Sequence, residues 1–176
     1  IIKYSLRDTK INEKSVSSIK DYSREAVNQL FKMDKFIDVL IPRGGKNLIK
    51  NVRDKSNIPV FSHLDGICHT YIDQYANIKM AVAVSLNAKM RRTSICGAVE
   101  TLLIDENVLK SHAKEIVNSL IRSGCEVRAD RKVNKLFNNK LKIAKDKDWK
   151  TEYLDAIISV KCVKNVHEGI DHILQY

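Results

Sequence analysis

The sequence predicts an α/β protein in which helices cover both faces of a parallel sheet. Three observations carry this prediction. Short apolar runs alternate with helical periods along the chain, polar or glycine residues separate them, and no internal repeat interrupts the alternation. No run of about 18 apolar residues is present, so no membrane-spanning segment is expected. With 44% hydrophobic and 30% charged residues, the composition is ordinary for a globular protein.

The first third of the chain combines two helical periods with two short apolar runs. Apolar side chains three and four residues apart share a helix face, whereas a short apolar run next to Pro or Gly is typical of a buried strand. The opening residues 1–6 could form one more strand. The expected helices are 21–34 and 46–56, and the expected buried strands are 36–43 and 58–63.

The rest of the chain continues the alternation. Gly124 closes the longest expected helix near its C-cap. The pattern of 130–150 is mixed and predicts no single element. The expected strands are 67–73, 99–105, 125–130 and 153–163, and the expected helices are 76–90, 107–124 and 166–176.

The chain is basic, with a net charge of +10. Lysines (22) outnumber arginines (9), and only 131–150 is dense in them, where Asp146 and Asp148 interrupt the run. Because Arg is the residue better suited to bidentate phosphate recognition, we do not expect nucleic acid as a partner. The N-terminal stretch lacks the layout of a secretion signal, so the expected location is the cytoplasm.

Cysteine spacing argues against a zinc site. None of the four cysteines forms a CxxC pair, and we expect the thiols to stay reduced. His63, Asp65 and His69 are close in sequence but match no standard metal motif, so no metal is expected. The four cysteines are Cys68, Cys96, Cys125 and Cys162.

Cys96 is the cysteine whose surroundings could favour reaction. It follows Arg91 and Arg92, and small residues flank it in the stretch "RRTSICGAV". A thiolate near cationic groups is a strong nucleophile. A free Cys can equally be a small buried hydrophobe, and the residues alone leave both readings open.

Two further stretches could bind a ligand. In "IPRGGKNLI" (41–49) an apolar run ends at Arg43, Gly44 and Gly45 turn the chain, and a helix begins, so backbone N–H groups could hold a phosphate. The stretch is neither GxGxxG nor a P-loop, and an ordinary tight turn is the alternative. In "DWKTEYLDAIISV" (148–160), Glu152 could bind a sugar hydroxyl, as could many surface acids.

Taken in order, four stretches resemble the gamma-glutamyl phosphate reductase family of the aldehyde dehydrogenase superfamily. The resemblance runs from about Asp21 to Tyr176. It implies an aldehyde dehydrogenase-like three-layer parallel sheet, truncated at both ends. Residues 1–66 would be the C-terminal part of a dinucleotide-binding domain, and 67–176 an incomplete catalytic domain. The stretches are "SREAVNQLFKMDKFIDVLIPRGGKNLI", "IPVFSHLDGICHTYID", "LNAKMRRTSICGAVETLLID" and "DWKTEYLDAIISVKCV".

The resemblance implies a reaction and a cofactor. Cys96 falls on the family's catalytic cysteine, whose thiolate attacks γ-glutamyl phosphate, expels phosphate and leaves a thioester. NADPH then reduces this thioester to glutamate 5-semialdehyde, in proline biosynthesis. Glu152 falls where the superfamily binds the nicotinamide-side ribose, and Arg43, Gly44 and Gly45 fall in a motif of the cofactor domain.

Substrate recognition is expected near the cysteine. By charge and proximity to Cys96 the candidates are His69, Asn87, Arg91 and Arg92. His63 stands where hydrolytic members of the superfamily have a general-base glutamate. An acyl-phosphate reductase needs no activated water, because phosphate is the exchanging group.

The cysteine turn also departs from the family. This chain reads "RTSICG" where the family usually reads RPGVCN, so it lacks a Pro and a Gly before the cysteine and an Asn after it. Family members are also more than twice as long. The alternative is therefore a catalytically inactive truncated remnant acting as a structural or binding module. In either case we expect a homo-oligomer or a complementing chain to cover exposed apolar surface.

Overall fold

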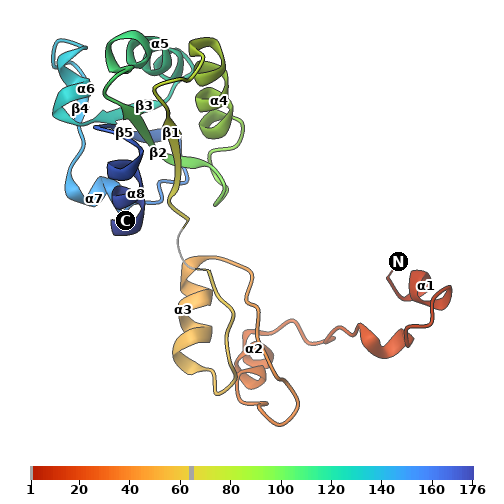
Figure 1. Cartoon of the computed structure of the whole chain (residues 1–176). Coiled ribbons are helices and arrows are strands. Elements are labelled where there is room, and N and C mark those ends of the chain that lie inside the picture. The colour runs from red at the N-terminus through yellow and green to blue at the C-terminus, as the bar shows by residue number, and fades with distance from the viewer. Residues whose placement is uncertain (1, 64–65) are drawn as a thin grey trace. The chain divides into compact units, whose positions relative to one another are not determined.

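A computed structural model describes residues 2–63 and 66–176 of the chain (Figure 1). The chain divides into two compact units, Ile1–Leu64 and Asp65–Tyr176. The assignment of a cofactor role to the first unit and a catalytic role to the second stays a prediction.

The first unit is made of short helices around a small apolar core. Ser23 caps α2 by accepting the Ala26 N–H at 3.1 Å, and Gly45 is the N-cap residue of α3. The buried apolar side chains are Phe31, Ile49, Val52 and Ile58. The helices are α1 (Ile2–Arg7), the 3₁₀ turn η1 (Glu13–Ser15), α2 (Arg24–Leu30) and α3 (Lys46–Lys55).

The strands expected in this unit do not form. Between 36–43 and 58–63 there is a single parallel bridge, Leu40 with Val60. Pro42 and Pro59 have no amide hydrogen to donate, so the ladder cannot extend far in either direction. The opening residues form α1 instead of a strand, because a helix closes its hydrogen bonds within the segment and needs no partner strand.

The second unit is built on a five-stranded sheet in the order β1-β2-β5-β3-β4, and every neighbouring pair is parallel. This confirms the predicted fold class. The strand expected at 153–163 begins only at Ile157, after a turn in which Leu154 has φ 52°. The strands are β1 (Cys68–Ile72), β2 (Val99–Asp105), β3 (Glu126–Ala129), β4 (Lys142–Ile143) and β5 (Ile157–Val163).

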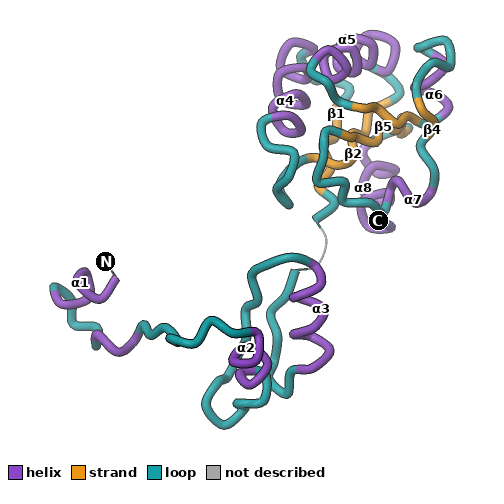
Figure 2. The backbone as a smooth tube through the Cα atoms, turned by 180° about the vertical axis from the view of Figure 1, so that it is seen from behind, coloured by secondary structure: helices purple, strands orange, loops and turns teal. Residues whose placement is uncertain are grey.

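Helices cover both faces of this sheet (Figures 1 and 2). Helices α4 and α5 lie on one face, and α7 and α8 lie on the other. The hydrophobic core is between the sheet and α4 and α5, where Leu102, Ile104 and Val160 pack with Ile116 and Leu120. The helices are α4 (Ile78–Met90), α5 (Leu109–Arg122), α6 (Arg131–Lys135), α7 (Asp146–Trp149) and α8 (Val166–Gln175).

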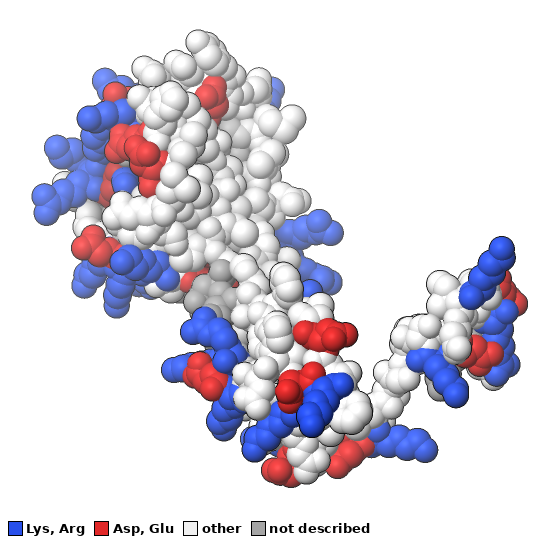
Figure 3. All heavy atoms as spheres, turned by 60° about the horizontal axis from the view of Figure 1, so that its bottom comes forward, with Lys and Arg blue, Asp and Glu red and all other residues white. Residues whose placement is uncertain are grey.

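Charge is mixed over the surface. On the face shown in Figure 3, acidic side chains are interspersed among the lysines and arginines, and much of the larger unit shows neither. A continuous basic stripe, which marks many nucleic-acid binders, is not seen on that face. Within residues 2–63 and 66–176, no helix has the length and apolar character needed to cross a bilayer.

Candidate active site

Cys96 lies in the loop that joins α4 to β2. Its side chain is exposed, and the turn around it is closed by the Ala98 N–H, which donates to the carbonyl of Ile95 at 3.0 Å. The α4 helix ends at Met90 and β2 begins at Val99. The thiol is therefore presented at the end of the sheet from which β2 starts, where a substrate can reach it.

A hollow of about 270 Å³ lies beside this cysteine. The predicted substrate residues Asn87, Arg91 and Arg92 all line it, together with Ile95 and Gly97, the two neighbours of Cys96. Cys96 itself is not among the lining residues. The two guanidinium groups of the lining favour an anionic ligand such as a phosphate or a carboxylate. The structure thus brings these candidates together, while their roles stay predictions.

Cys68 supports the loop from the neighbouring strand. Its thiol donates to the backbone carbonyl of Cys96, with Sγ 3.3 Å from the oxygen. Burial, together with the nearby negative groups of Cys96, Glu100 and Glu152, raises the pKa of Cys68. Cys68 therefore remains a protonated donor at neutral pH. This contact follows from the pairing of Cys68 with Val99 across β1 and β2, and the sequence alone, which singled out only Cys96, does not reveal it.

Glu152 is half-buried in the segment that leads into β5. Its negative charge contributes to the raised pKa of Cys68, so its carboxylate lies within electrostatic reach of that thiol. The next residue, Tyr153, is held firmly. Its hydroxyl bonds to the Oδ1 of Asp148 at 3.1 Å and to the Oγ of Ser159 at 2.8 Å.

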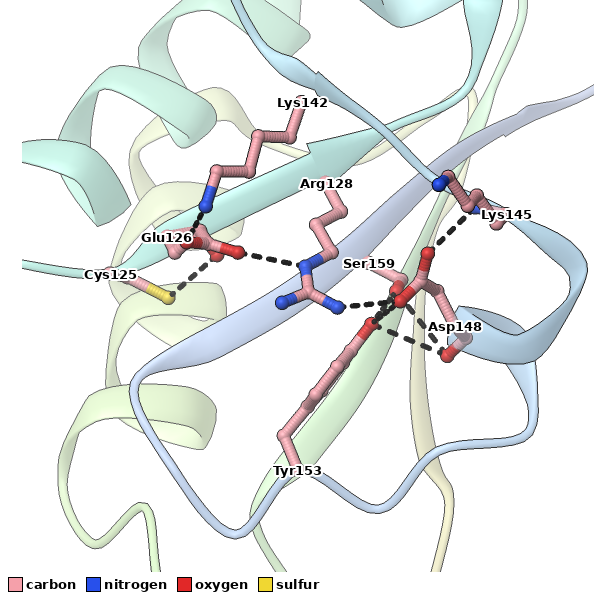
Figure 4. Close-up of polar contacts among 8 residues, drawn as sticks. All are labelled: Cys125, Glu126, Arg128, Lys142, Lys145, Asp148, Tyr153 and Ser159. Atoms are coloured by element: carbon pink, nitrogen blue, oxygen red, sulfur yellow. Dashed lines mark hydrogen bonds and ion pairs between the residues drawn. The ribbon is translucent and has the colours of Figure 1, made fainter.

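A polar network anchors Tyr153 beneath β3 and β5 (Figure 4). Arg128 lies between Glu126 and Asp148, and its Nη1 donates to the Oδ1 of Asp148 at 2.6 Å. The same guanidinium lies 5.1 Å from the centre of the Tyr153 ring. Burial raises the pKa of Tyr153 to about 12, so the phenol stays protonated and can donate a hydrogen bond.

Two buried charges next to the cysteine loop were also missed by sequence reasoning. Lys89, on the last turn of α4, forms an ion pair with Glu100 on β2, with Nζ 2.7 Å from Oε2. One signal was available, because Glu100 is a charged residue within the mostly apolar run "VETLLI".

His69 lies elsewhere. Its Nδ1 is 2.7 Å from the carbonyl of Ile67, and its ring packs edge-on against His172, with centroids 5.4 Å apart. It does not line the hollow beside Cys96. His63 is exposed, and Asp65 is outside the described residues. Over the described part of the chain, no group of three or more His, Cys, Asp or Glu side chains could hold a metal ion.

The first unit holds the predicted phosphate turn. Gly44 has φ +155°, and a Cβ there would lie 2.7 Å from the Cδ2 of Leu48. Gly45 begins α3 without any side-chain cap. It borders a hollow of about 740 Å³ that Arg24 and Asn47 also line, whereas the exposed Arg43 is not among the lining residues. An uncapped helix start, a glycine turn and a guanidinium fit a phosphate-bearing group such as a dinucleotide.

Comparisons with known proteins agree on one enzyme. No family model matches the sequence. The chain is 46% identical over 169 residues to a gamma-glutamyl phosphate reductase of Mesorhizobium japonicum, covering 96% of this chain and 39% of the relative. It also superposes on the crystal structure of gamma-glutamyl phosphate reductase from Thermotoga maritima with a TM-score of 0.85 and 40% identity, covering 99% of this chain and 42% of that one.

A more distant comparison concerns the fold alone. An acetylating aldehyde dehydrogenase from Geobacillus thermoglucosidasius aligns with a TM-score of 0.58 at 21% identity, over 89% of this chain and 42% of that one. The chain is thus homologous to gamma-glutamyl phosphate reductase across most of its length and has an aldehyde dehydrogenase-like fold. It spans between 33% and 39% of the length of the curated relatives it matches.

Proposed function

We propose that this chain carries the reactive-cysteine part of a gamma-glutamyl phosphate reductase, an oxidoreductase of proline biosynthesis. The observation that carries the proposal is the position of Cys96, an exposed thiol beside a hollow lined by Arg91 and Arg92. Cys96 also lies in a chain that is closely similar in sequence to that enzyme.

The cysteine starts the reaction. The thiolate of Cys96 attacks the γ-carbonyl carbon of γ-glutamyl phosphate and forms a C–S bond. The C–O bond to phosphate breaks, and inorganic phosphate leaves with its electron pair, so a thioester remains on Cys96. Arg91 and Arg92 would stabilise the negative charge of the phosphate, and the backbone N–H of Cys96 would help to hold the developing oxyanion.

The proposed cofactor is NADP(H), which supplies the hydride that reduces the thioester to the aldehyde. Glu152 would hold ribose hydroxyls. The turn at Arg43, Gly44 and Gly45 would hold phosphate groups at the start of α3. The bonds of Tyr153 to Asp148 and Ser159 keep the segment that carries Glu152 in place. We also propose that NADP is preferred over NAD. The turnover assay described below measures this preference when it is run with each cofactor.

Location and partner are further parts of the proposal. All four cysteines are free thiols, which suits the reducing cytoplasm. The α8 helix leaves an apolar row exposed, in which Ile170 is 47% and Leu174 81% accessible. A second copy of the chain or a complementing chain would cover this row.

The test is phosphate-dependent reduction of NADP by glutamate 5-semialdehyde, the reverse of the biosynthetic direction. We expect turnover that disappears in Cys96→Ser and persists in Cys125→Ser, where the replaced thiol lies in the core. If a second copy completes the site, turnover per chain will rise with protein concentration.

Two results would contradict the proposal. One is turnover that survives in Cys96→Ser. The other is no turnover at any concentration, which would favour the alternative of an inactive structural or binding module.

A further inference from the structure

The base of the cysteine loop is closed by a buried ion pair. Lys89 precedes the loop and Glu100 follows it, so the pair joins the two chain segments between which Cys96 lies. The side chains are 0% and 1% exposed, with Nζ and Oε2 2.7 Å apart. A contact this well shielded from water is screened little by salt.

Glu100 occupies a bulge in the sheet. Cys68 pairs with Val99 and His69 pairs with Thr101, so β2 has one residue more than β1 at this point, and that residue is Glu100. A bulge redirects the side chain of the extra residue and often lies beside an active site. Here the redirected side chain is the carboxylate that receives Lys89.

The second oxygen of the same carboxylate binds a different segment. Oε1 of Glu100 accepts the backbone N–H of Leu154 at 3.3 Å. Leu154 has φ 52°, a left-handed conformation that costs a non-glycine residue on the order of 1 kcal/mol and persists only when its surroundings hold it. Leu154 lies two residues after Glu152 in the sequence. One carboxylate therefore bonds both to the end of α4, from which the cysteine loop starts, and to the segment of the proposed cofactor contact.

Packing alone does not account for these charges. An apolar pair of similar volume often stabilises a core as well as a buried ion pair does, because two charges must lose their hydration. Burial also raises the pKa of Glu100, which shows the cost of keeping it ionised. What the carboxylate adds is two directed bonds to two separate segments.

We propose that Lys89 and Glu100 are positioning residues that hold the Cys96 loop and segment 152–154 in a fixed relative arrangement. This rests on the proposed function, in which Cys96 and Glu152 act on the same substrate and cofactor. Neither Lys89 nor Glu100 touches the reacting atoms. They act through the backbone segments that they join.

Hydrogen exchange followed by mass spectrometry tests the coupling without any substrate. Single variants leave an unpaired buried charge and can fail to fold, so two double variants are compared. In Lys89→Met/Glu100→Leu, peptides covering 95–98 and 152–154 should both exchange about tenfold faster, with α5 unchanged. In Lys89→Met/Glu100→Gln, the amide oxygen still accepts the Leu154 N–H. Segment 152–154 should then exchange as in the unchanged chain, while 95–98 stays fast.

The control is Leu120→Ala, which removes a fully buried core side chain on α5 and should speed exchange across the whole unit. The proposal is overturned if the two double variants behave alike at 152–154. It is also overturned if 95–98 is unaffected, or if exchange rises equally in α5.

A kinetic comparison completes the test. Where the unchanged chain turns over, Lys89→Met/Glu100→Leu should lower kcat by about tenfold or more, because a misplaced nucleophile slows the chemical step. Leu120→Ala should leave kcat unchanged below its unfolding temperature. Lack of turnover in the unchanged chain would count against the proposed function, whereas hydrogen exchange alone decides the coupling.

Discussion

At the scale of single residues, the surroundings of each cysteine set its chemistry. Burial raises the pKa of Cys125 and of Cys162 to about 11, and burial with nearby negative groups raises that of Cys68. Cys96 alone among the four is exposed. Because the thiolate is the reactive form, the raised pKa values disfavour reaction at Cys68, Cys125 and Cys162.

His172 makes stability depend on pH. Its ring is 2% exposed, and burial, the charge of Lys161 and the charge of His69 lower its pKa to about 4. Lys161 donates to its Nδ1 at 3.1 Å, and the rings of Trp149 and Tyr176 pack against it. In the unfolded chain the imidazole takes up a proton near pH 6.5. Between these values the unfolded state binds more protons, so the free energy of unfolding falls as pH falls.

We therefore expect the free energy of unfolding of the unchanged chain to fall between pH 6.5 and about 4. In His172→Phe this fall should be smaller by about 2 to 3 kcal/mol over the same range. Chemical denaturation at a series of pH values, followed by Trp149 fluorescence, measures this difference. His167→Gln, at an exposed position of the same helix, is the control. Parallel pH profiles for His172→Phe and the unchanged chain would refute the assignment.

At the scale of elements, the turn before α3 requires glycine at position 44 more strictly than at position 45. Gly44→Ser would place a Cβ against Leu48 at a φ of +155°, which should cost about 1 to 3 kcal/mol. Gly45 has φ −69° and open space around its Cα, so Gly45→Ser should supply the missing N-cap and stabilise α3 slightly. Hydrogen exchange of peptides from 46–55 should therefore speed up in the first variant and slow down in the second. Equal effects would show that the turn is not restricted in this way.

The strands predicted well from sequence are those that have a neighbouring strand on each side. β2 and β5 are mostly apolar and have neighbouring strands on both sides; β2 has its predicted bounds, and β5 ends where predicted but begins at Ile157. The runs 36–43 and 58–63 have the same composition but form only one bridge, because an apolar run becomes a strand only where a partner ladder exists.

At the scale of the whole molecule, some residues of the candidate site could be predicted from the sequence and others could not. Asn87, Arg91 and Arg92 lie near Cys96 partly because they are near it in sequence, and local reasoning found them. The contacts of Cys68 and Glu100 depend on strand order and on a bulge. A charge within a mostly apolar run pointed to Glu100, but no local pattern gave the partners of either residue. The resemblance to a known family supplied Glu152, whose distance from Cys96 in sequence had concealed any relation.

The central claim is that Cys96 is the nucleophile, and intact-protein mass spectrometry tests it most directly. The chain is mixed with freshly made γ-glutamyl phosphate and no NADPH, so that the thioester has no route to reduction. We expect a γ-glutamyl adduct on Cys96 that hydroxylamine removes and that is absent in Cys96→Ser. No adduct on Cys96, or an adduct that persists in Cys96→Ser, would contradict the account.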